Sequence, residues 1–331
     1  MKRPPAMEEF DYVVVGSGSA GSVLANRLSE DGRHSVLVLE HGGSDRSVFI
    51  QMPSALAIPM NSPRYDWGYH TEPEPHLDGR SLHCPRGKVI GGSSSINGMV
   101  YVRGHALDFE RWAEEGAAGW SYGEVLPYFR RAEARAEGGD AYRGDAGPLN
   151  TSYGRLANPL YRCFIEAGRQ AGYAESEDLN GYRQEGFGRF DMTVHRGRRW
   201  SAANAYLRPA LRRPNVDLRA HCLATRVLLD GRRAIGIAYR RGGQEFQVRA
   251  RRDTILAGGP INSPQLLELS GIGRPEELAR HGIELRHALP GVGENLQDHL
   301  EFYFQMACTK PITLYSSLGP MAKLRIGLRW L

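Results

Sequence analysis

The chain has 331 residues, of which 41% are hydrophobic and 24% are charged, and its formal net charge is +5 at pH 7. This composition is that of an ordinary globular protein, and it excludes a disordered chain and a chain built of membrane spans. The arginines are scattered and form no stripe with stacking aromatic residues, so a nucleic-acid-binding protein is not expected. The length allows a large core and predicts two domains.

The N-terminus and the cysteines indicate a cytoplasmic protein. Residues 1–10 contain two basic residues but no apolar signal segment, and no window approaches the roughly 18 uninterrupted apolar residues of a membrane span. The four cysteines form no C-x-x-C pair, which argues against a disulfide framework and against a metal site. Because the net charge is positive, peripheral contact with an anionic surface such as the inner membrane stays open.

Residues 10–39 form a nearly complete dinucleotide-binding βαβ unit. An apolar strand over residues 10–15 leads into a glycine turn and a helix, and the turn consists of Gly16, Ser17, Gly18, Ser19, Ala20 and Gly21. Gly16 permits the tight turn, Gly18 lets a pyrophosphate approach the main chain, and Gly21 lets the helix pack closely. The helix presents its unpaired N–H groups and the positive end of its dipole to the phosphates.

A second strand over residues 35–39 ends at Glu40. This residue follows Gly21 at about the 20-residue spacing of a carboxylate that accepts hydrogen bonds from the adenosine ribose hydroxyls. A carboxylate there disfavours the 2′-phosphate of NADP. The bare glycine pattern is weak evidence in a glycine-rich chain, so the prediction depends on the strand, helix, strand and acid around it. The unit alone leaves open whether the dinucleotide is FAD or NAD.

Two segments after this unit suggest contact with the cofactor. Residues 42–85 are rich in proline, glycine and aromatic residues, so we expect an extended excursion that lines the cofactor or covers the active site; a variable surface loop is the alternative. Residues 86–104 contain Gly91, Gly92 and Ser93, and such small residues suit close passage of the backbone along a phosphate or a flat ring. A small-residue turn into a buried helix explains this second segment equally well.

The centre of the chain predicts a helix and a β-meander. Residues 158–172 have the period of an amphipathic helix, and residues 216–219, 224–229, 234–239 and 245–249 read as short strands. Turns at residues 230–231 and 242–243 would join the last three strands.

A second strand, turn and helix follows the meander. A strand over residues 253–257 enters the turn Gly258-Gly259-Pro260, and a helix over residues 263–270 follows. Ser263 suits the N-cap, Pro264 the first helical position, and Gly271 the left-handed position after the helix. This unit would approach the same cofactor, although an unrelated βα unit is the alternative.

These segments resemble the glucose-methanol-choline (GMC) oxidoreductases, a family of FAD-dependent alcohol dehydrogenases and oxidases. Residues 86–104 are similar to the first family signature, residues 259–273 to the second, and residues 290–299 to the segment that follows it. Residues 72–75, 93–99, 178–182 and 184–188 look most like the choline dehydrogenases.

The resemblance implies an α/β fold with two discontinuous domains. An FAD-binding, doubly wound (Rossmann-like) domain with the inserted β-meander would comprise residues 1–150 and 205–298. An incomplete α+β substrate or cap domain would comprise residues 151–204 and 299–331.

The resemblance also implies an FAD site in which the three glycine turns converge. The expected cofactor-binding residues are Gly16, Ser17, Gly18, Ser19, Ala20, Gly21, Glu40, Val89, Gly91, Gly92, Ser93, Asn97, Gly98, Met99, Val100 and Val227. Val227 would lie beside the adenine, although on its own it reads as a core valine. Some relatives carry a histidine that bonds covalently to the flavin; Ile96 stands at that position here, so we expect non-covalent FAD.

The chemistry that the resemblance implies is removal of the alcohol proton by a histidine base and hydride transfer to flavin N5. The family's base lies in the last third of a longer chain, whereas this sequence stops at Leu331 and looks truncated. We therefore name no catalytic base among its 11 histidines. The resemblance gives His299 a structural place at a domain crossover, and His105 and His195 read as surface or satisfied polar residues.

The function that the resemblance favours is oxidation of choline to betaine aldehyde, with a respiratory electron acceptor left open. Glu301 matches the position where a choline-oxidising relative holds the trimethylammonium group, and strand alternation would put Tyr303 on the same face. An exposed strand glutamate is the alternative. A GMC dehydrogenase for another primary alcohol, a catalytically silent FAD-binding fragment and a relative of the family's lyase branch also remain alternatives.

Overall fold

The computed structural model describes residues 7–299, 301 and 303–330. The chain divides into two compact units. Unit 1 comprises Met1–Gln51, Ala55–Asn97 and Ser201–Leu300, and unit 2 comprises Met52–Ser54, Gly98–Trp200 and Glu301–Leu331. Residues 1–6, part of the segment predicted to lack a signal, and Leu331, where truncation is expected, lie outside the described residues.

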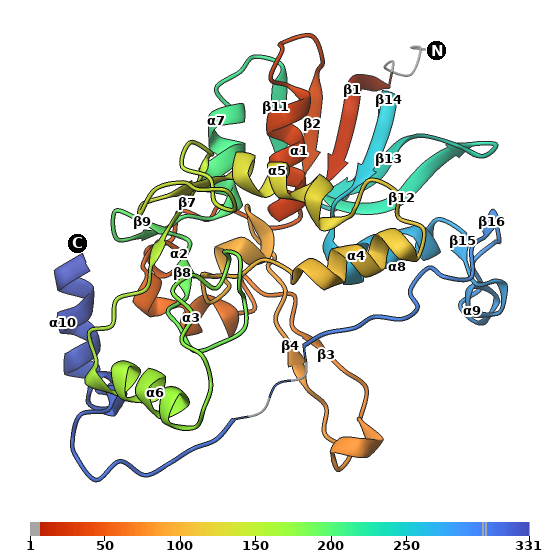
Figure 1. Ribbon diagram of the computed structural model, residues 1–331. Helices are drawn as coiled ribbons and strands as arrows, with labels where there is room; N and C mark the ends of the chain where they lie inside the picture. The colour runs from red at the N-terminus through yellow and green to blue at the C-terminus, as the bar shows by residue number, and fades with distance from the viewer. Residues whose placement is uncertain (1–6, 300, 302, 331) are drawn as a thin grey trace. The chain divides into compact units, whose positions relative to one another are not determined.

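Unit 1 is built on a six-stranded sheet with the order β11-β2-β1-β14-β13-β12 (Figure 1). The strands are β1 (Glu8–Val15), β2 (Val36–Leu39), β11 (Val216–Arg219), β12 (Leu223–Asp230), β13 (Arg233–Arg241) and β14 (Gln244–Leu256). The pairs β11–β2, β2–β1 and β1–β14 are parallel, whereas β13 pairs antiparallel with both of its neighbours. The predicted α/β fold with an inserted meander is therefore confirmed.

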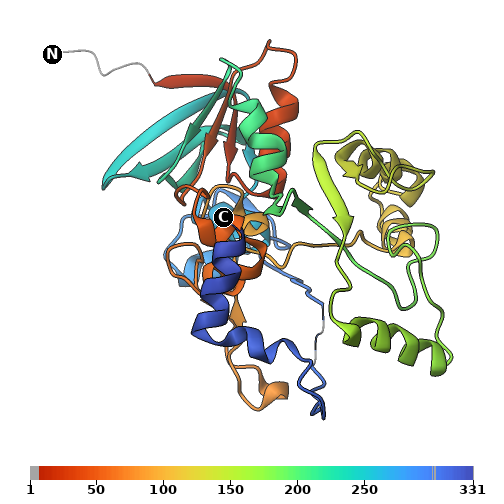
Figure 2. The same cartoon turned by 90° about the vertical axis from the view of Figure 1, so that its left-hand side faces the viewer.

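Helices cover both faces of this sheet because its central strands are apolar on both sides. On one face, Val13 and Leu37 belong to a core cluster with Leu266 of α8 (Gly259–Leu269). On the other face, Val14 clusters with Ala25 of α1 (Ser19–Leu28). The helices α1 and α7 (Arg208–Ala210) lie side by side near β2 and β11, as Figures 1 and 2 show.

The strand β14 is continuous where the sequence predicted two strands. Its first half pairs antiparallel with β13, and its second half runs parallel to β1 as far as the pair Val15 and Leu256. The sequence predicted separate strands over residues 245–249 and 253–257, but the structure has one strand, in which Arg249 lies 3.6 Å from Glu9 and Arg251 lies 3.1 Å from Asp11. The predicted break was wrong because charges on the neighbouring strand β1 satisfy this run.

The predicted excursion over residues 42–85 contains short regular elements. They are α2 (Val48–Gln51), η1 (Pro53–Ala55), α3 (Ala57–Met60), β3 (Tyr69–His70), η2 (Pro75–Leu77) and β4 (His83–Cys84). β3 and β4 form an antiparallel hairpin, which Figure 1 shows in orange. Met52–Ser54, which includes most of η1, groups with unit 2. The further elements of unit 1 are η3 (Gly92–Ser95), the π-helical turn η4 (Ala203–Leu207), β15 (Ile272–Gly273), α9 (Pro275–Arg280) and β16 (His287–Ala288).

The helix α8 begins at Gly259, before the predicted start at Ser263. Pro260 takes the first-turn position that was predicted for Pro264, which lies inside the helix. Ser263 is not the N-cap residue. Its hydroxyl, which lies inside the helix, accepts a hydrogen bond from the Gly258 N–H at 3.0 Å and so gives a partner to a backbone donor at the helix start. Gly271, with φ +82°, ends the helix as predicted.

Unit 2 contains a four-stranded sheet with the order β5-β8-β7-β6. Its elements are β5 (Val100–Tyr101), α4 (Ala106–Glu114), α5 (Tyr122–Ala132), β6 (Glu133–Arg135), β7 (Leu149–Tyr153), α6 (Pro159–Gln170), β8 (Asp191–Met192), β9 (Val194–His195), β10 (Arg198–Arg199), η5 (Leu314–Leu318) and α10 (Pro320–Trp330). The helix predicted at 158–172 is α6, which the Asn158 side chain caps.

The compact units differ from the predicted domain boundaries. Residues 98–150, predicted to belong to the first domain, group with unit 2. The reason is strand pairing, since β5 and β7 both pair with β8, which lies far along the chain.

A buried ionic network joins the strands of unit 2. Arg143 is fully buried and donates to both carboxylate oxygens of Glu133, at 3.0 and 2.6 Å, and to Asp191 at 2.8 Å. Arg103 adds a 2.6 Å bond to Glu133. Burial acts to raise the pKa of Glu133, but the hydrogen bonds from Arg143 and Thr151 outweigh it and lower that pKa. Glu133 is therefore held as a buried carboxylate.

Candidate cofactor site

Three glycine turns of unit 1 line one cavity of about 500 Å³. They are the turn between β1 and α1, the turn at Gly92 and Ser93, and the turn between β14 and α8. The residues of these turns that line the cavity are Gly16, Gly18, Ser19, Ala20, Gly92, Ser93, Ala257, Gly258 and Gly259. Segments that are far apart in the sequence therefore meet at one site, as the resemblance implied.

Glycine is required where these turns approach one another. A Cβ on Gly16, whose φ is +95°, would lie 2.5 Å from the Ala257 carbonyl oxygen, and a Cβ on Gly92 would lie 2.7 Å from Gly18 Cα. A Cβ on Gly21 would lie 1.9 Å from the Gly16 carbonyl oxygen. Backbone hydrogen bonds join the turns, from Gly91 N–H to the Ser17 carbonyl at 3.1 Å and from Ala257 N–H to the Val15 carbonyl at 2.8 Å.

The N-terminus of α1 is suited to an anion. Gly18 is its N-cap and supplies no side-chain cap, and the first turn holds no acidic residue. The N–H groups of the first turn have no partner within the helix and lie at the positive end of its dipole. Ser19 and Ala20, which begin this turn, line the cavity. This geometry fits a dinucleotide pyrophosphate.

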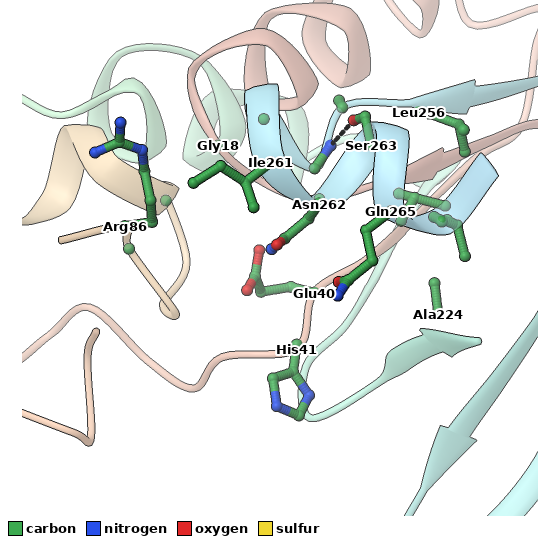
Figure 3. Close-up of a pocket in the computed structure, with 18 of the residues that line it drawn as sticks. Gly18, Glu40, His41, Arg86, Ala224, Leu256, Ile261, Asn262, Ser263 and Gln265 are labelled. Carbon is green, nitrogen blue, oxygen red and sulfur yellow. Dashed lines mark hydrogen bonds between the residues drawn. The ribbon is translucent and has the colours of Figure 1, made fainter. Parts of the chain in front are cut away.

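Glu40 lines the same cavity from the end of β2 (Figure 3). Its Oε2 accepts hydrogen bonds from the Ser17 N–H at 2.9 Å and the Ser17 hydroxyl at 2.7 Å, and its Oε1 accepts one from the Gly42 N–H at 2.7 Å. Burial raises the pKa of Glu40, and these hydrogen bonds act against it. Glu40 thus also fixes the first glycine turn, a role that spacing did not predict.

The cavity wall includes residues that the sequence analysis did not single out. His41 and Trp67 stack with ring centroids 4.8 Å apart, and the Trp67 ring stacks on Tyr69 at 5.8 Å. Arg86 supplies a cation to the cavity, and its N–H donates to the Asp66 carboxylate at 2.7 Å. The signal that could have revealed Arg86 is a basic residue directly before a glycine turn.

The other wall is formed by β12 and α8. Leu223 and Ala224 of β12 line the cavity, together with Asn262, Gln265 and Leu269 of α8. Val227 is 5% exposed, belongs to the core cluster of Leu266, and is not among the described residues that line the cavity. Its N–H donates to the Ser270 hydroxyl at 2.8 Å. Its proposed place beside the adenine stays a prediction.

The first family signature, residues 86–104, is divided between the two units. Val89 is fully buried in a cluster with Ile50, Tyr65 and Ile96, and Gly91 has the left-handed φ of +89°. Asn97 is exposed at the end of a unit 1 segment. Gly98, Met99 and Val100 belong to unit 2, and their contact with FAD also stays a prediction.

The histidines discussed for catalysis lie in varied surroundings. His105 caps α4 by accepting a hydrogen bond from the Leu107 N–H. His195 packs against Trp200 with ring centroids 4.9 Å apart. His299 is exposed, and its backbone N–H donates to the Asp298 side chain. His41, which the sequence analysis did not discuss, is the histidine among the described lining residues of the cavity.

Glu301 is exposed and is not in a strand, so the predicted strand alternation is wrong for the described residues around it. None of residues 303–307 pairs with a strand. The backbone N–H and C=O groups of such an unpaired segment form their hydrogen bonds with water. A hydrogen bond with Glu301 raises the pKa of the exposed Tyr303. The two side chains still meet, but along an irregular segment.

The described residues contain neither a cluster of metal ligands nor a membrane-spanning helix. No group of three or more His, Cys, Asp and Glu side chains in this part of the chain could hold a metal ion. A helix able to span a bilayer is absent from the same residues.

Comparison with known proteins identifies the family. The family model for GMC oxidoreductases matches residues 10–301. This chain belongs to the GMC oxidoreductase family. Its cofactor is FAD, and the uncapped helix N-terminus, the converging glycine turns and Glu40 fit that dinucleotide.

The relatives of this GMC chain include both curated sequences and solved structures. It is 58% identical to the oxygen-dependent choline dehydrogenase of Brucella anthropi and 57% identical to that of Photobacterium profundum, over 98% and 97% of its own length. It spans 59% and 57% of those relatives. Pyridoxine 4-oxidase from Mesorbium loti has a TM-score of 0.84 and 36% identity, over 87% of this chain and 57% of that one. An FAD-dependent oxidoreductase from Chaetomium thermophilum has a TM-score of 0.81 and 32% identity, over 87% and 52%.

Proposed function

We propose that this GMC chain forms the FAD-binding part of an enzyme that oxidises choline to betaine aldehyde. The observation that carries the proposal is the cavity between three glycine turns, in a chain 58% identical over 98% of its length to a protein named choline dehydrogenase. The chain spans 59% of that relative, so the substrate, the electron acceptor and the catalytic base are parts of the proposal. We expect the base in the part of the relatives that this chain does not span.

The residues of unit 1 would hold FAD along the cavity. The N–H groups at the start of α1 and the Arg86 guanidinium would neutralise the pyrophosphate, and Glu40 would accept a hydrogen bond from the adenosine ribose. When bound, FAD supplies a hydride acceptor at flavin N5. The protein supplies position and charge.

Unit 2 would then be the start of the substrate domain. In this proposal Glu301 meets the trimethylammonium group of choline, helped by the aromatic face of Tyr303. The contact between these two side chains supports the pairing, since an acid and a ring side by side suit a quaternary ammonium ion.

Contact with a membrane surface remains a proposal that rests on net charge.

The proposed function can be tested by adding alcohols, without oxygen, to an FAD-loaded protein that contains this chain and is as long as its relatives. Choline is expected to bleach the visible flavin absorbance, because hydride transfer reduces the flavin. Faster bleaching by an unrelated primary alcohol would overturn choline as substrate. A bound flavin that no alcohol bleaches would favour a silent FAD-binding module or a lyase-branch relative.

The linkage to FAD is a separate prediction. Ile96 is 2% exposed and packs in the core with Ile50, Tyr65 and Val89, and it offers no nucleophile for a covalent flavin bond. Acid precipitation of the holoprotein is therefore expected to leave the yellow colour in the supernatant. Colour retained in the washed pellet would contradict non-covalent binding.

A further inference from the structure

A row of side chains in unit 1 connects Glu40 to the helix α8. His41 directly follows Glu40 and stacks on Trp67, and Trp67 stacks on Tyr69. The Tyr69 hydroxyl then donates a 2.6 Å hydrogen bond to Oδ1 of Asn262. His41, Trp67 and Asn262 all line the cavity. Residues from the excursion thus contact the first turn of α8 beside the cofactor site.

The hydrogen bond from Tyr69 orients the Asn262 amide. Because Oδ1 accepts from the phenol, the Nδ2 group is the remaining donor of the side chain. No described residue accepts a hydrogen bond from Nδ2. Figure 3 shows Asn262 extending from α8 toward Glu40. Burial raises the pKa of Tyr69, which keeps its hydroxyl protonated as the donor.

Glu40 cannot recognise the ribose alone. A carboxylate offers about four lone-pair sites, Ser17 and Gly42 already fill three of those on Glu40, and the backbone N–H of His41 also interacts with this carboxylate. At most one site is left, whereas the adenosine ribose of a dinucleotide carries two hydroxyls. A ribose hydroxyl that donates to Glu40 also needs a donor for its own oxygen, and an amide N–H pointing into the cavity is suitable.

We propose that Asn262 binds the adenosine ribose through its Nδ2 group and that Tyr69 is a positioning residue that holds the Asn262 amide in place. The inference rests on the proposed FAD site and extends it to two residues outside the glycine turns. The ribose is then held between Glu40 of β2, which accepts, and Asn262 of α8, which donates.

The test is calorimetric titration of the apoprotein with ADP, 2′-deoxy-ADP and 3′-deoxy-ADP, since ADP carries the relevant ribose and pyrophosphate. Asn262→Ala is expected to raise the Kd for ADP about fivefold, the equivalent of one neutral hydrogen bond of roughly 1 kcal/mol. The same substitution is expected to leave the Kd unchanged for the deoxy analogue that lacks the contacted hydroxyl. Equal losses with all three ligands, or no loss with ADP, would overturn the role of Asn262.

Tyr69→Phe tests the positioning role because it removes only the hydroxyl. It is expected to raise the Kd for ADP by less than Asn262→Ala does and to add nothing in the double variant, since both act through one amide. Additive losses would overturn the positioning role. Tyr128→Phe and Asn61→Ala are matched controls: Tyr128 is 70% exposed, Asn61 is also exposed, and neither lines the cavity.

The inference and the proposed function fail in different ways. A wild-type protein that binds neither FAD nor ADP would overturn both. A wild-type protein that binds FAD, together with an Asn262→Ala variant that binds every ligand as tightly as wild type, would overturn the inference alone.

Discussion

Replacing Arg143 by methionine is expected to lower the free energy of unfolding by about 3–5 kcal/mol. The Arg143 side chain is fully buried and bonds to Glu133, Asp178 and Asp191. Methionine fills a similar volume but leaves buried carboxylates without their main counter-charge. The cost of desolvating those charges is then no longer offset, which makes the loss large for a single substitution.

Urea unfolding followed by tryptophan fluorescence would measure this loss, since Trp200 belongs to unit 2 and its Nε1 donates to the Pro148 carbonyl. Arg169→Met is the matched control. Arg169 also forms a two-pronged contact with a carboxylate, Glu166, but both side chains are exposed. The control is expected to unfold at the wild-type midpoint because water screens that pair. Similar midpoints for the two variants would show that the buried network contributes little.

Gly21→Ala is expected to abolish measurable FAD binding and to lower the free energy of unfolding by about 3 kcal/mol. The added Cβ would lie 1.9 Å from the Gly16 carbonyl oxygen and 3.3 Å from the Ala257 Cβ. The helix α1 would have to move away from the first glycine turn. Its N-terminal N–H groups would then leave the position that suits the pyrophosphate.

Flavin fluorescence titration and urea unfolding together check the Gly21 prediction. Gly123→Ala is the control, because Gly123 also lies in a helix, α5, and a Cβ there would meet nothing within 4 Å. Alanine at Gly123 is expected to be neutral or to stabilise by up to about 1 kcal/mol, as helix propensity favours it. An alanine at Gly21 that binds FAD normally would refute close packing as the reason for this glycine.

Turn residues explain much of what could be predicted. Gly231, Gly242 and Gly243 adopt positive φ at the two meander turns, where local chemistry alone favours them. Local rules gave a wrong position where two nearby residues both suited the same place in a helix. Pro260 takes the first-turn position of α8, so the prediction that Pro264 would occupy it was wrong and Pro264 lies inside the helix.

Contacts between distant strands explain where the structure differs from the predicted strands and from the predicted domain division. The sequence predicted two strands where β14 is continuous, because the pairing of its arginines with Glu9 and Asp11 of β1 cannot be read from a local pattern. Glu133 and Asp191, which are buried together around Arg143, gave no sequence signal because isolated acids are ordinarily exposed. The same pairing of distant strands moved residues 98–150 into unit 2.

The amino-acid sequence by itself determined the βαβ unit, its glycine turns, the acid at its second strand, the meander and the family, because each depends on period, turn chemistry or motif within a short window. Only the tertiary structure decided that Glu40 shares its lone pairs with Ser17 and Gly42 and that Tyr69 contacts Asn262 across 193 residues. Such contacts depend on how the sheet and its helices pack, and no local pattern specifies which distant side chains meet.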